Sequence, residues 1–493
     1  MISGVDGFKS LNNHLLKITD FFDPGPVRTI EFDREDKCFM KKLRVKIKAG
    51  GKNLSKDYPY WEGYVKPLLS KNLDDIIWAL SEQVDQDAPS RDPDPTSYAR
   101  MTLLANAAIQ HAEPEVAEDI QSLQKIVTEM YTSFLTARQK LGAEGGDLDH
   151  TFPPLVGYIG HLPSKVKFKP SLRIPMPCVV ELEQLRGLLG PVYGGPFKVG
   201  ALGLSAGYRN HPLMWGVLGH ELGGHYCLTA DKKDKLMLEI QDKVYAMLQD
   251  KYPRSPLNVA APLWRFWAEE AAADVCCVLN LGPHAAIGAI AFFTALLPLA
   301  GWTTTSLLSQ EYTNNRFDAH PIPALIPHLI SGAVVGLLMF TDERKRDSAK
   351  LITEIGAAYT GTSDVVAFPS YSKVYSPSDT RDLPIDLPSK ELPLKEMRNI
   401  AHDVGQFITT VKLEALNKRA LRDLEIAWNN DDEDNALIAR DKFMEQNSWD
   451  FMIKGTKAKN RHLLAGGLLA VMQNHALYDN VSQALRTAFA KDA

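Results

Sequence analysis

The chain has 493 residues, a net charge of −5 and a hydrophobic content of 45%. A chain of this length and hydrophobicity can bury a large core, which excludes disorder as a description of the whole molecule. Its slightly acidic balance gives no electrostatic basis for nucleic-acid binding, so no nucleic-acid partner is expected.

The N-terminal part, residues 1–195, is expected to be a mixed helical and β region. Residues 30–48 include an alternation of apolar and basic side chains, which predicts a half-buried strand with a solvated outer face. A helical pattern follows over residues 96–142. Residues 143–195 are rich in Gly and Pro and predict loops with short strands.

The cysteines and the N-terminus indicate the compartment. The five cysteines are odd in number and scattered, with no disulfide framework and no C-x-x-C metal spacing. This usage fits a reducing compartment. The N-terminus lacks a basic start followed by an apolar stretch, so no signal peptide is expected and a cytoplasmic location is favoured. Adjacent Cys276 and Cys277 are expected to be small core residues.

Residues 196–345 hold the densest candidate chemistry and are expected to form the catalytic core. The segment HELGGH at residues 220–225 has the form H-E-x-x-x-H, one residue longer than the H-E-x-x-H of many zinc enzymes. On a regular helix, positions i and i+5 lie ~140° apart and cannot share a metal ion. A one-residue π-type bulge would bring His225 back beside His220, and Gly223 and Gly224 permit that distortion.

A third ligand is expected on the downstream helix that carries Glu269, Glu270 and Asp274. Glu270 and Asp274 are four residues apart and share a face. In a workable arrangement Glu270 binds the metal, and Asp274 holds a ligand histidine through its second nitrogen. Glu269 would contact substrate or a histidine. Two histidines and one glutamate leave an open position for water on Zn²⁺, which is the catalytic pattern.

Glu221 directly follows the first histidine and is the predicted general base. Zinc lowers the pKa of its water toward ~7, and the carboxylate takes the proton as the water attacks a carbonyl. A further donor is needed to stabilise the oxyanion. His320 is the candidate for this catalytic role, with Tyr312 and Tyr226 behind it.

The two motifs resemble those of the dipeptidyl peptidase III family, HExxGH and EExxxE/D. In that family the two histidines and the second glutamate of the pair bind zinc, and the glutamate after the first histidine is the base. The resemblance implies His220, His225 and Glu270 as zinc ligands and Glu221 as the base. Asp274 stands where the family usually has glutamate. More broadly, the pattern is similar to the zincin metallopeptidases whose third ligand is glutamate, the gluzincins.

Other functions stay open. A set of two histidines and one carboxylate also suits non-haem iron, so the site could act on a specialised small molecule without hydrolysis. A non-catalytic binding protein could retain the fold, although Glu221 argues against this. The segment GLSAG at residues 203–207 matches the nucleophile elbow G-x-S-x-G, with Ser205 as nucleophile. The favoured interpretation of this segment is a strand edge near the metal, along which a substrate pairs.

Two apolar runs, residues 285–302 and 324–340, approach the ~20 residues needed to span a bilayer. Pro298 interrupts the first and His328 lies inside the second, so buried core helices are favoured over a membrane hairpin. Trp264 and Trp267 are likewise expected in the core.

Residues 346–394 are expected to form an irregular linker or crossing, because Ser, Pro, Asp and Thr are frequent over residues 360–394. Residues 395–493 predict a C-terminal helical region with an acidic break at residues 429–435. The fold prediction is mainly α with a small β-sheet (α+β), in which helical regions flank a zincin-like metallohydrolase core. The predicted function is a zinc metallopeptidase with a peptide or small-molecule substrate. The sequence does not specify the number of subunits.

Overall fold

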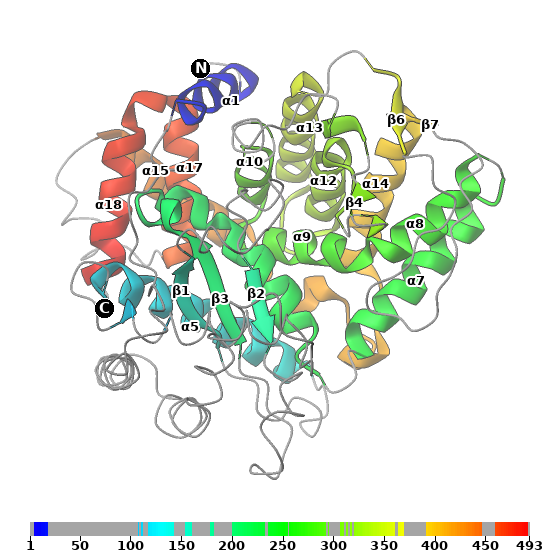
Figure 1. The fold of residues 1–493 in the computed structure, drawn as a ribbon, viewed down its shortest axis with the longest axis horizontal. Helices are drawn as coiled ribbons and strands as arrows, with labels where there is room; N and C mark the ends of the chain where they lie inside the picture. The colour runs from blue at the N-terminus through cyan, green and yellow to red at the C-terminus, as the bar shows by residue number, and fades with distance from the viewer. Residues whose placement is uncertain are drawn as a thin grey trace, which may run out of the picture. The chain divides into compact units, whose positions relative to one another are not determined.

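The structure is a computed structural model. It describes residues 4–17, 107, 110–111, 117–141, 153–159, 178–181, 200–231, 235–254, 256–291, 294, 306–309, 312–313, 316–317, 320–359, 363–368, 391–445 and 459–491. These residues are mostly helical with a small sheet, which confirms the predicted mainly α class (Figure 1). The strand expected within residues 30–48 lies outside the described residues.

The chain divides into two compact units. The first comprises residues 1–18, 133–147 and 213–481, and the second comprises residues 19–132, 148–212 and 482–493. The boundaries expected at residues 195, 345 and 394 follow composition rather than contacts, and they stay a prediction.

The second unit contains a three-stranded sheet in the order β1-β3-β2, formed by β1 (Leu155–Ile159), β2 (Cys178–Glu181) and β3 (Gly200–Ser205). β3 is parallel to β1, with Leu155 opposite Ala201, and antiparallel to β2, with Cys178 opposite Gly203. The favoured interpretation of GLSAG as a strand edge is therefore wrong. The apolar side chains of Leu202 and Leu204 are buried, and β3 takes the central position in the described sheet.

Two glutamine side chains close the outer edge of β1. The Gln110 amide donates to Tyr158 O and accepts from Tyr158 N, both at 2.7 Å. The Gln124 amide, on α5 (Ala117–Lys140), donates to Pro154 O at 3.0 Å and accepts from Val156 N at 2.8 Å. Because the amides replace a neighbouring strand, these backbone groups are satisfied without one.

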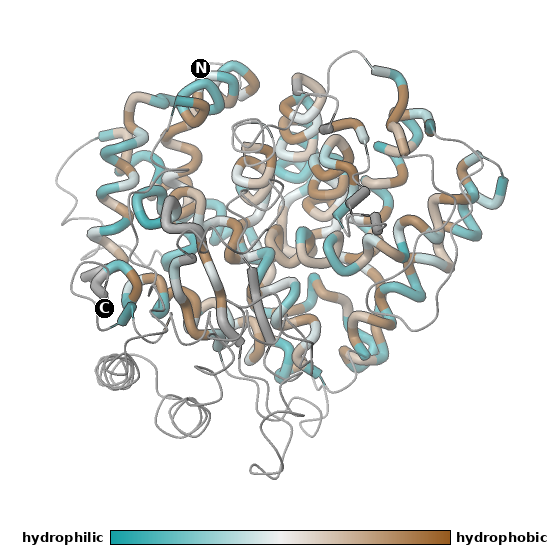
Figure 2. Tube along the Cα trace, in the orientation of Figure 1, coloured by the Kyte–Doolittle hydropathy of each residue, from teal (hydrophilic) through white to brown (hydrophobic). Residues whose placement is uncertain are grey.

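The first unit is helical, and α9 (Ala268–Leu281) lies at its centre. All but one of its residues are buried, because its sequence is rich in Ala, Val, Leu and Cys on every side. The elements that pack against it are η7 (Gly219–Tyr226), α7 (Lys235–Lys251), α8 (Ala260–Phe266), α10 (His284–Ala291), α12 (Ile326–Gly336), α14 (Leu394–Thr410) and α17 (Asn460–Gln473). Figure 2 shows mainly hydrophobic colouring along α9 and α12.

Both apolar runs contribute buried helices, namely α10 and α12. α12 crosses α14 in backbone contact, since a Cβ atom on Gly332 would overlap His402 O and one on Gly405 would overlap Leu329 O. Among the described residues, the apolar helices fall short of the length and hydrophobicity that a bilayer crossing requires.

The region expected to be irregular, residues 346–394, is helical at its start. α13 (Asp342–Tyr359) continues to residue 359 because residues 346–359 contain good helix formers such as Lys, Arg, Leu, Glu and Ala. That expectation is wrong for residues 346–359. β6 (Val365–Ala367) and β7 (Glu391–Pro393) then pair antiparallel, and residues 369–390 lie outside the description.

The acidic segment expected as a break begins a helix instead. α15 (Asn430–Glu445) carries Asp431, Asp432 and Glu433 in its first turn, where carboxylates suit the positive end of the helix dipole. The Asn429 side chain accepts from the N–H groups of Asp431 and Asp432 at 2.9 and 3.2 Å. The interruption in the C-terminal helices lies earlier, at residues 411–429.

The remaining described elements are short or terminal. They are α1 (Gly4–Leu15), η5 (Ala206–Arg209), η6 (Pro212–Val217), η8 (Leu257–Val259), η10 (Ser306–Leu308), β4 (Tyr312–Thr313), β5 (Arg316–Phe317), η11 (Pro323–Leu325), η12 (Glu414–Leu416), η13 (Leu421–Asp423), η14 (His475–Leu477) and α18 (Tyr478–Lys491).

A buried polar cluster lies at the C-terminal end of α9. Gly282 ends the helix with φ +59°, and a Cβ atom there would meet the Trp428 ring at 2.5 Å. Trp428 Nε1 donates to Glu433 Oε2 at 3.0 Å, and His284 Nε2 lies 3.0 Å from the same oxygen.

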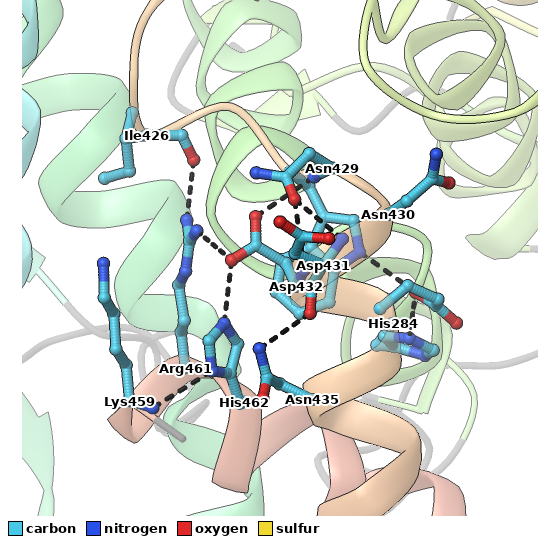
Figure 3. Close-up of polar contacts among 12 residues, drawn as sticks. His284, Ile426, Asn429, Asn430, Asp431, Asp432, Asn435, Lys459, Arg461 and His462 are labelled. Atoms are coloured by element: carbon cyan, nitrogen blue, oxygen red, sulfur yellow. Dashed lines mark hydrogen bonds and ion pairs between the residues drawn. The ribbon is translucent and has the colours of Figure 1, made fainter. Parts of the chain in front are cut away.

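The neighbouring carboxylate in this cluster, Asp432, joins α15 to α17. His462 Nε2 lies 2.8 Å from Asp432 Oδ1, and Arg461 pairs with the same oxygen (Figure 3). Arg461 also donates to Ile426 O at 2.6 Å. Burial alone would raise the pKa of Asp432, but the contacts with His462 and Arg461 outweigh it and lower the pKa.

Asp432→Asn is expected to destabilise the protein by about 3–5 kcal/mol at pH 7, because it removes the carboxylate that pairs with the largely buried Arg461 and with His462. The Asp432 pKa is lower in the folded chain than its unfolded value of ~3.9, so its stabilisation is present above that value and is lost as the pH falls through the folded pKa. The difference between variant and wild type should therefore shrink below about pH 4.

The measurement is the free energy of unfolding by denaturant at several pH values. Asp441→Asn is the matched control, since Asp441 forms an exposed pair with Arg440 and should contribute at most about 1 kcal/mol. If the loss in free energy of unfolding caused by Asp432→Asn does not change with pH, the lowered pKa of Asp432 is not the source of the stabilisation.

Candidate metal centre

The motif HELGGH forms a π-helix, η7, over Gly219–Tyr226. The Cys227 N–H donates to Leu222 O, five residues back, which is the i→i+5 pattern of this winding. The predicted π-type distortion is confirmed, although it extends over eight residues rather than a single bulge. As a result, His220 and His225 lie on the same side of the helix with ring centroids 5.0 Å apart.

The glycines of the motif allow η7 to approach α9 closely. Both Gly223 and Gly224 lie inside the π winding that they were expected to permit, and neither has a positive φ. A Cβ atom on Gly224 would overlap Ala273 Cα and Cβ, and one on Gly223 would lie 3.2 Å from Cys276 Cβ. The missing side chains therefore set the distance between the two helices.

Three ligand atoms converge from these helices. His220 Nε2, His225 Nε2 and Glu270 Oε2 form a triangle with all three sides equal to 3.2 Å. Bonds of ~2.0–2.2 Å to a tetrahedral zinc ion correspond to edges of ~3.3–3.6 Å between ligands. The triangle thus has nearly the dimensions of one face of a zinc tetrahedron.

Carboxylates of α9 hold the second nitrogen of each histidine. His220 Nδ1 lies 2.9 Å from Asp274 Oδ1, as the predicted arrangement requires, and His225 Nδ1 lies 3.1 Å from Glu269 Oε1. When the imidazoles are neutral and each Nδ1–H is donated to a carboxylate, both Nε2 lone pairs point into the triangle. Three lone-pair-bearing atoms at this separation repel unless a cation or protons lie between them, so the donor set fits a metal ion.

The electrostatics of the site also favour a cation. Burial alone would lower the pKa of His220, but Asp274 and Glu270 raise it to about 10. Burial would likewise lower the pKa of His225, which Glu270 and Glu269 raise well above its usual value. The carboxylates therefore make the site favourable for positive charge, carried either by protons on the histidines or by a divalent ion.

The pKa values of Glu221 and Glu270 shift in opposite directions. Burial raises the pKa of Glu221, and the neighbouring histidines offset this only in part. Burial would raise the pKa of Glu270 too, but His225 and His320 outweigh it and hold the pKa well below its usual range. Glu221 is the better proton acceptor of the two.

His320 borders the triangle. Its Nε2 lies 3.1 Å from Glu270 Oε2, and its ring is nearly parallel to that of His220, with centroids 6.5 Å apart. The His320 side chain is 31% exposed, so it lies between the ligands and solvent. Tyr226 is buried in the last turn of η7. The backbone of Tyr312 lies on β4, and its side chain is outside the description.

The expected core residues near the site are buried. Trp264 and Trp267 are both 0% exposed and pack edge to face with centroids 5.3 Å apart, which confirms their assignment to the core. Cys276 and Cys277 are buried and free, as is Cys227. Ser205 is the last residue of β3, and η5 follows it directly. β3 belongs to a small sheet with one parallel and one antiparallel pairing. That sheet differs from the alternating βα pattern expected around a nucleophile elbow.

Arg138 was not among the residues expected at the site. Its guanidinium donates to Cys227 O, directly after η7, at 2.5 Å. No motif or spacing in the sequence links position 138 to position 227, so only the fold reveals this contact.

Comparisons of the chain with profiles of known protein families, with curated proteins and with solved structures find no match.

Gly224→Ala is expected to destabilise the protein by about 1–3 kcal/mol and to weaken metal binding, because the new methyl group overlaps Ala273 and separates η7 from α9. The measurements are the free energy of unfolding and the zinc bound per chain. Gly288→Ala on α10 is the control, since a Cβ atom there meets no atom within 4 Å. An unchanged zinc content in the Gly224 variant would contradict this account of the helix contact.

Proposed function

We propose that the protein is a zinc-dependent hydrolase, and specifically a metallopeptidase with His220, His225 and Glu270 as zinc ligands. The observation that supports this most directly is the 3.2 Å triangle of His220 Nε2, His225 Nε2 and Glu270 Oε2. Three protein ligands, rather than four, are typical of catalytic zinc sites.

Bound there, zinc supplies Lewis-acid activation of water and of a carbonyl group. Glu221 accepts the proton from the attacking water and transfers it to the amine nitrogen that leaves. Its burial favours this role, because a desolvated carboxylate is more basic than one in water. His320 Nε2 donates to the carbonyl oxygen as negative charge develops on it.

Glu269 and Asp274 keep the ligand histidines in place. Each carboxylate accepts from one Nδ1–H, which fixes the ring orientation and makes Nε2 a stronger donor to the metal. The same pairing is compatible with the two-motif resemblance to the dipeptidyl peptidase III family, and membership of the gluzincins is part of this proposal. The free buried cysteines agree with a reducing, cytoplasmic setting.

The purified protein is expected to contain about one zinc per chain, and His225→Ala and Glu270→Ala are each expected to lose it, because each removes one of three ligands. Elemental mass spectrometry measures the content. His475→Ala, which removes an exposed histidine on η14, should keep its zinc. Iron at similar occupancy with the same losses would replace the hydrolase proposal by the non-haem iron alternative.

Glu221→Gln is expected to keep its zinc while peptide hydrolysis falls by about 10²–10⁴-fold, since the amide cannot accept the proton. Hydrolysis is measured on a peptide mixture by mass spectrometry, with zinc content determined in parallel. Glu343→Gln, at an exposed position on α13, should behave as wild type. If the zinc-loaded wild type cleaves no peptide in the mixture, the peptidase assignment is wrong even though the metal site stands.

A further inference from the structure

One face of α5 packs against the π-helix. Phe134 and Arg138 are four residues apart and therefore lie on the same face of α5. A Cβ atom on Gly223 would lie 3.3 Å from Phe134 Cε2, so this ring packs against the middle of η7. Arg138 reaches the end of η7, where it donates to Cys227 O at 2.5 Å.

Arg138 is itself fixed by a buried ion pair. Its second guanidinium nitrogen lies 2.5 Å from Asp231 Oδ2, and the two side chains are 1% and 5% exposed. Asp231 accepts from the N–H groups of Lys235 and Leu236 at 2.6 and 3.2 Å, at the start of α7. The guanidinium therefore cannot follow Cys227 O if that atom moves.

The position of Cys227 O depends on the winding of η7. In the π winding, the Cys227 N–H donates to Leu222 O. If the segment took the α winding, the end of the helix would shift by about one residue, which is ~1.5 Å along the axis and ~100° around it. Cys227 O would then leave Arg138, and His225 would leave His220. The contact with Arg138 and the convergence of the histidines thus require the same winding.

We propose that Arg138 is a positioning residue for the metal centre, which holds the π winding of η7 through Cys227 O and so keeps His220 and His225 on one metal ion. Arg138 acts through the backbone, and Asp231 keeps the guanidinium in place. This inference rests on the metal-binding function proposed above.

The test is the double variant Arg138→Met, Asp231→Asn in the full chain. Changing both residues avoids a buried carboxylate without a partner, and the amide oxygen introduced at position 231 can still cap α7. The first readout is the visible absorption spectrum of the cobalt(II)-loaded protein, which reports the coordination geometry. The second is the zinc dissociation constant, determined by competition with a chromophoric chelator.

Arg461→Met, Asp432→Asn is the matched control. This Arg–Asp pair, drawn in Figure 3, is largely buried, with side chains 12% and 8% exposed. Arg461 lies over the Trp428 ring, which meets Gly282 at the C-terminal end of α9. Both double variants should lower the unfolding temperature of the metal-free protein. Only the Arg138 variant is expected to weaken zinc binding by about 10–100-fold, the range for residues that orient metal ligands, and to change the cobalt spectrum.

An unchanged spectrum and affinity in the Arg138 variant would overturn the proposal, as would an equal loss of affinity in the Arg461 control. If the double variant does not fold, Arg138→Lys replaces it, because lysine keeps the charge beside Asp231 but lacks the planar fork with which Arg138 reaches Asp231 and Cys227 O through separate nitrogens. Weaker zinc binding by Arg138→Lys supports the proposal, and wild-type affinity overturns it. A wild type that binds neither ion shows instead that the proposed metal-binding function has failed.

Discussion

The close backbone contact between η7 and α9 is the constraint on which the rest of the site depends. Every residue of the triangle and both carboxylates behind it lie on one of these two helices. Each histidine of η7 contacts two carboxylates of α9, one through each ring nitrogen. Small residues at the contact, including Gly224 and Ala273, bring the two helices close enough for the histidines of η7 to reach the carboxylates of α9. A larger separation would leave several buried charges without partners, so packing and electrostatics impose the same distance.

The surroundings of α9 explain how this contact stays in place. Apolar helices pack against it on several sides, and the polar cluster around Trp428 and Asp432 fixes the region where it ends. The candidate site is at the opposite end of the same helix, on its first two turns. α9 is therefore fixed at its C-terminal end by structural contacts and carries the candidate site at its N-terminal end. Apolar and polar contacts near the C-terminal end of α9 therefore help to fix the position of the acidic residues at its N-terminal end.

The sequence predicted those parts of the site that depend on local spacing. The five-residue interval between His220 and His225 indicated the π winding, and the four-residue interval between Glu270 and Asp274 placed both carboxylates on one face. Contacts between distant segments were not predictable in this way. The central position of β3 depends on which strands pair with it, and the role of Arg138 depends on a contact across 89 residues. The helix start at Asn430 was missed because a cluster of acidic residues was taken as a break rather than as an N-terminal turn.

The π winding of η7 also bears on how such sites can change during evolution. A residue added inside a metal-binding helix shifts every later side chain by ~100°, which would separate the ligands if the helix kept its regular winding. Here one additional residue between the two histidines is absorbed by the backbone, and the ligand atoms still meet at 3.2 Å. This arrangement of donor atoms in space therefore does not require the four-residue spacing of H-E-x-x-H. A helix can therefore contain one extra residue between two metal ligands and still bring them together. This requires small residues on the neighbouring helix, because a π turn is wider than an α turn.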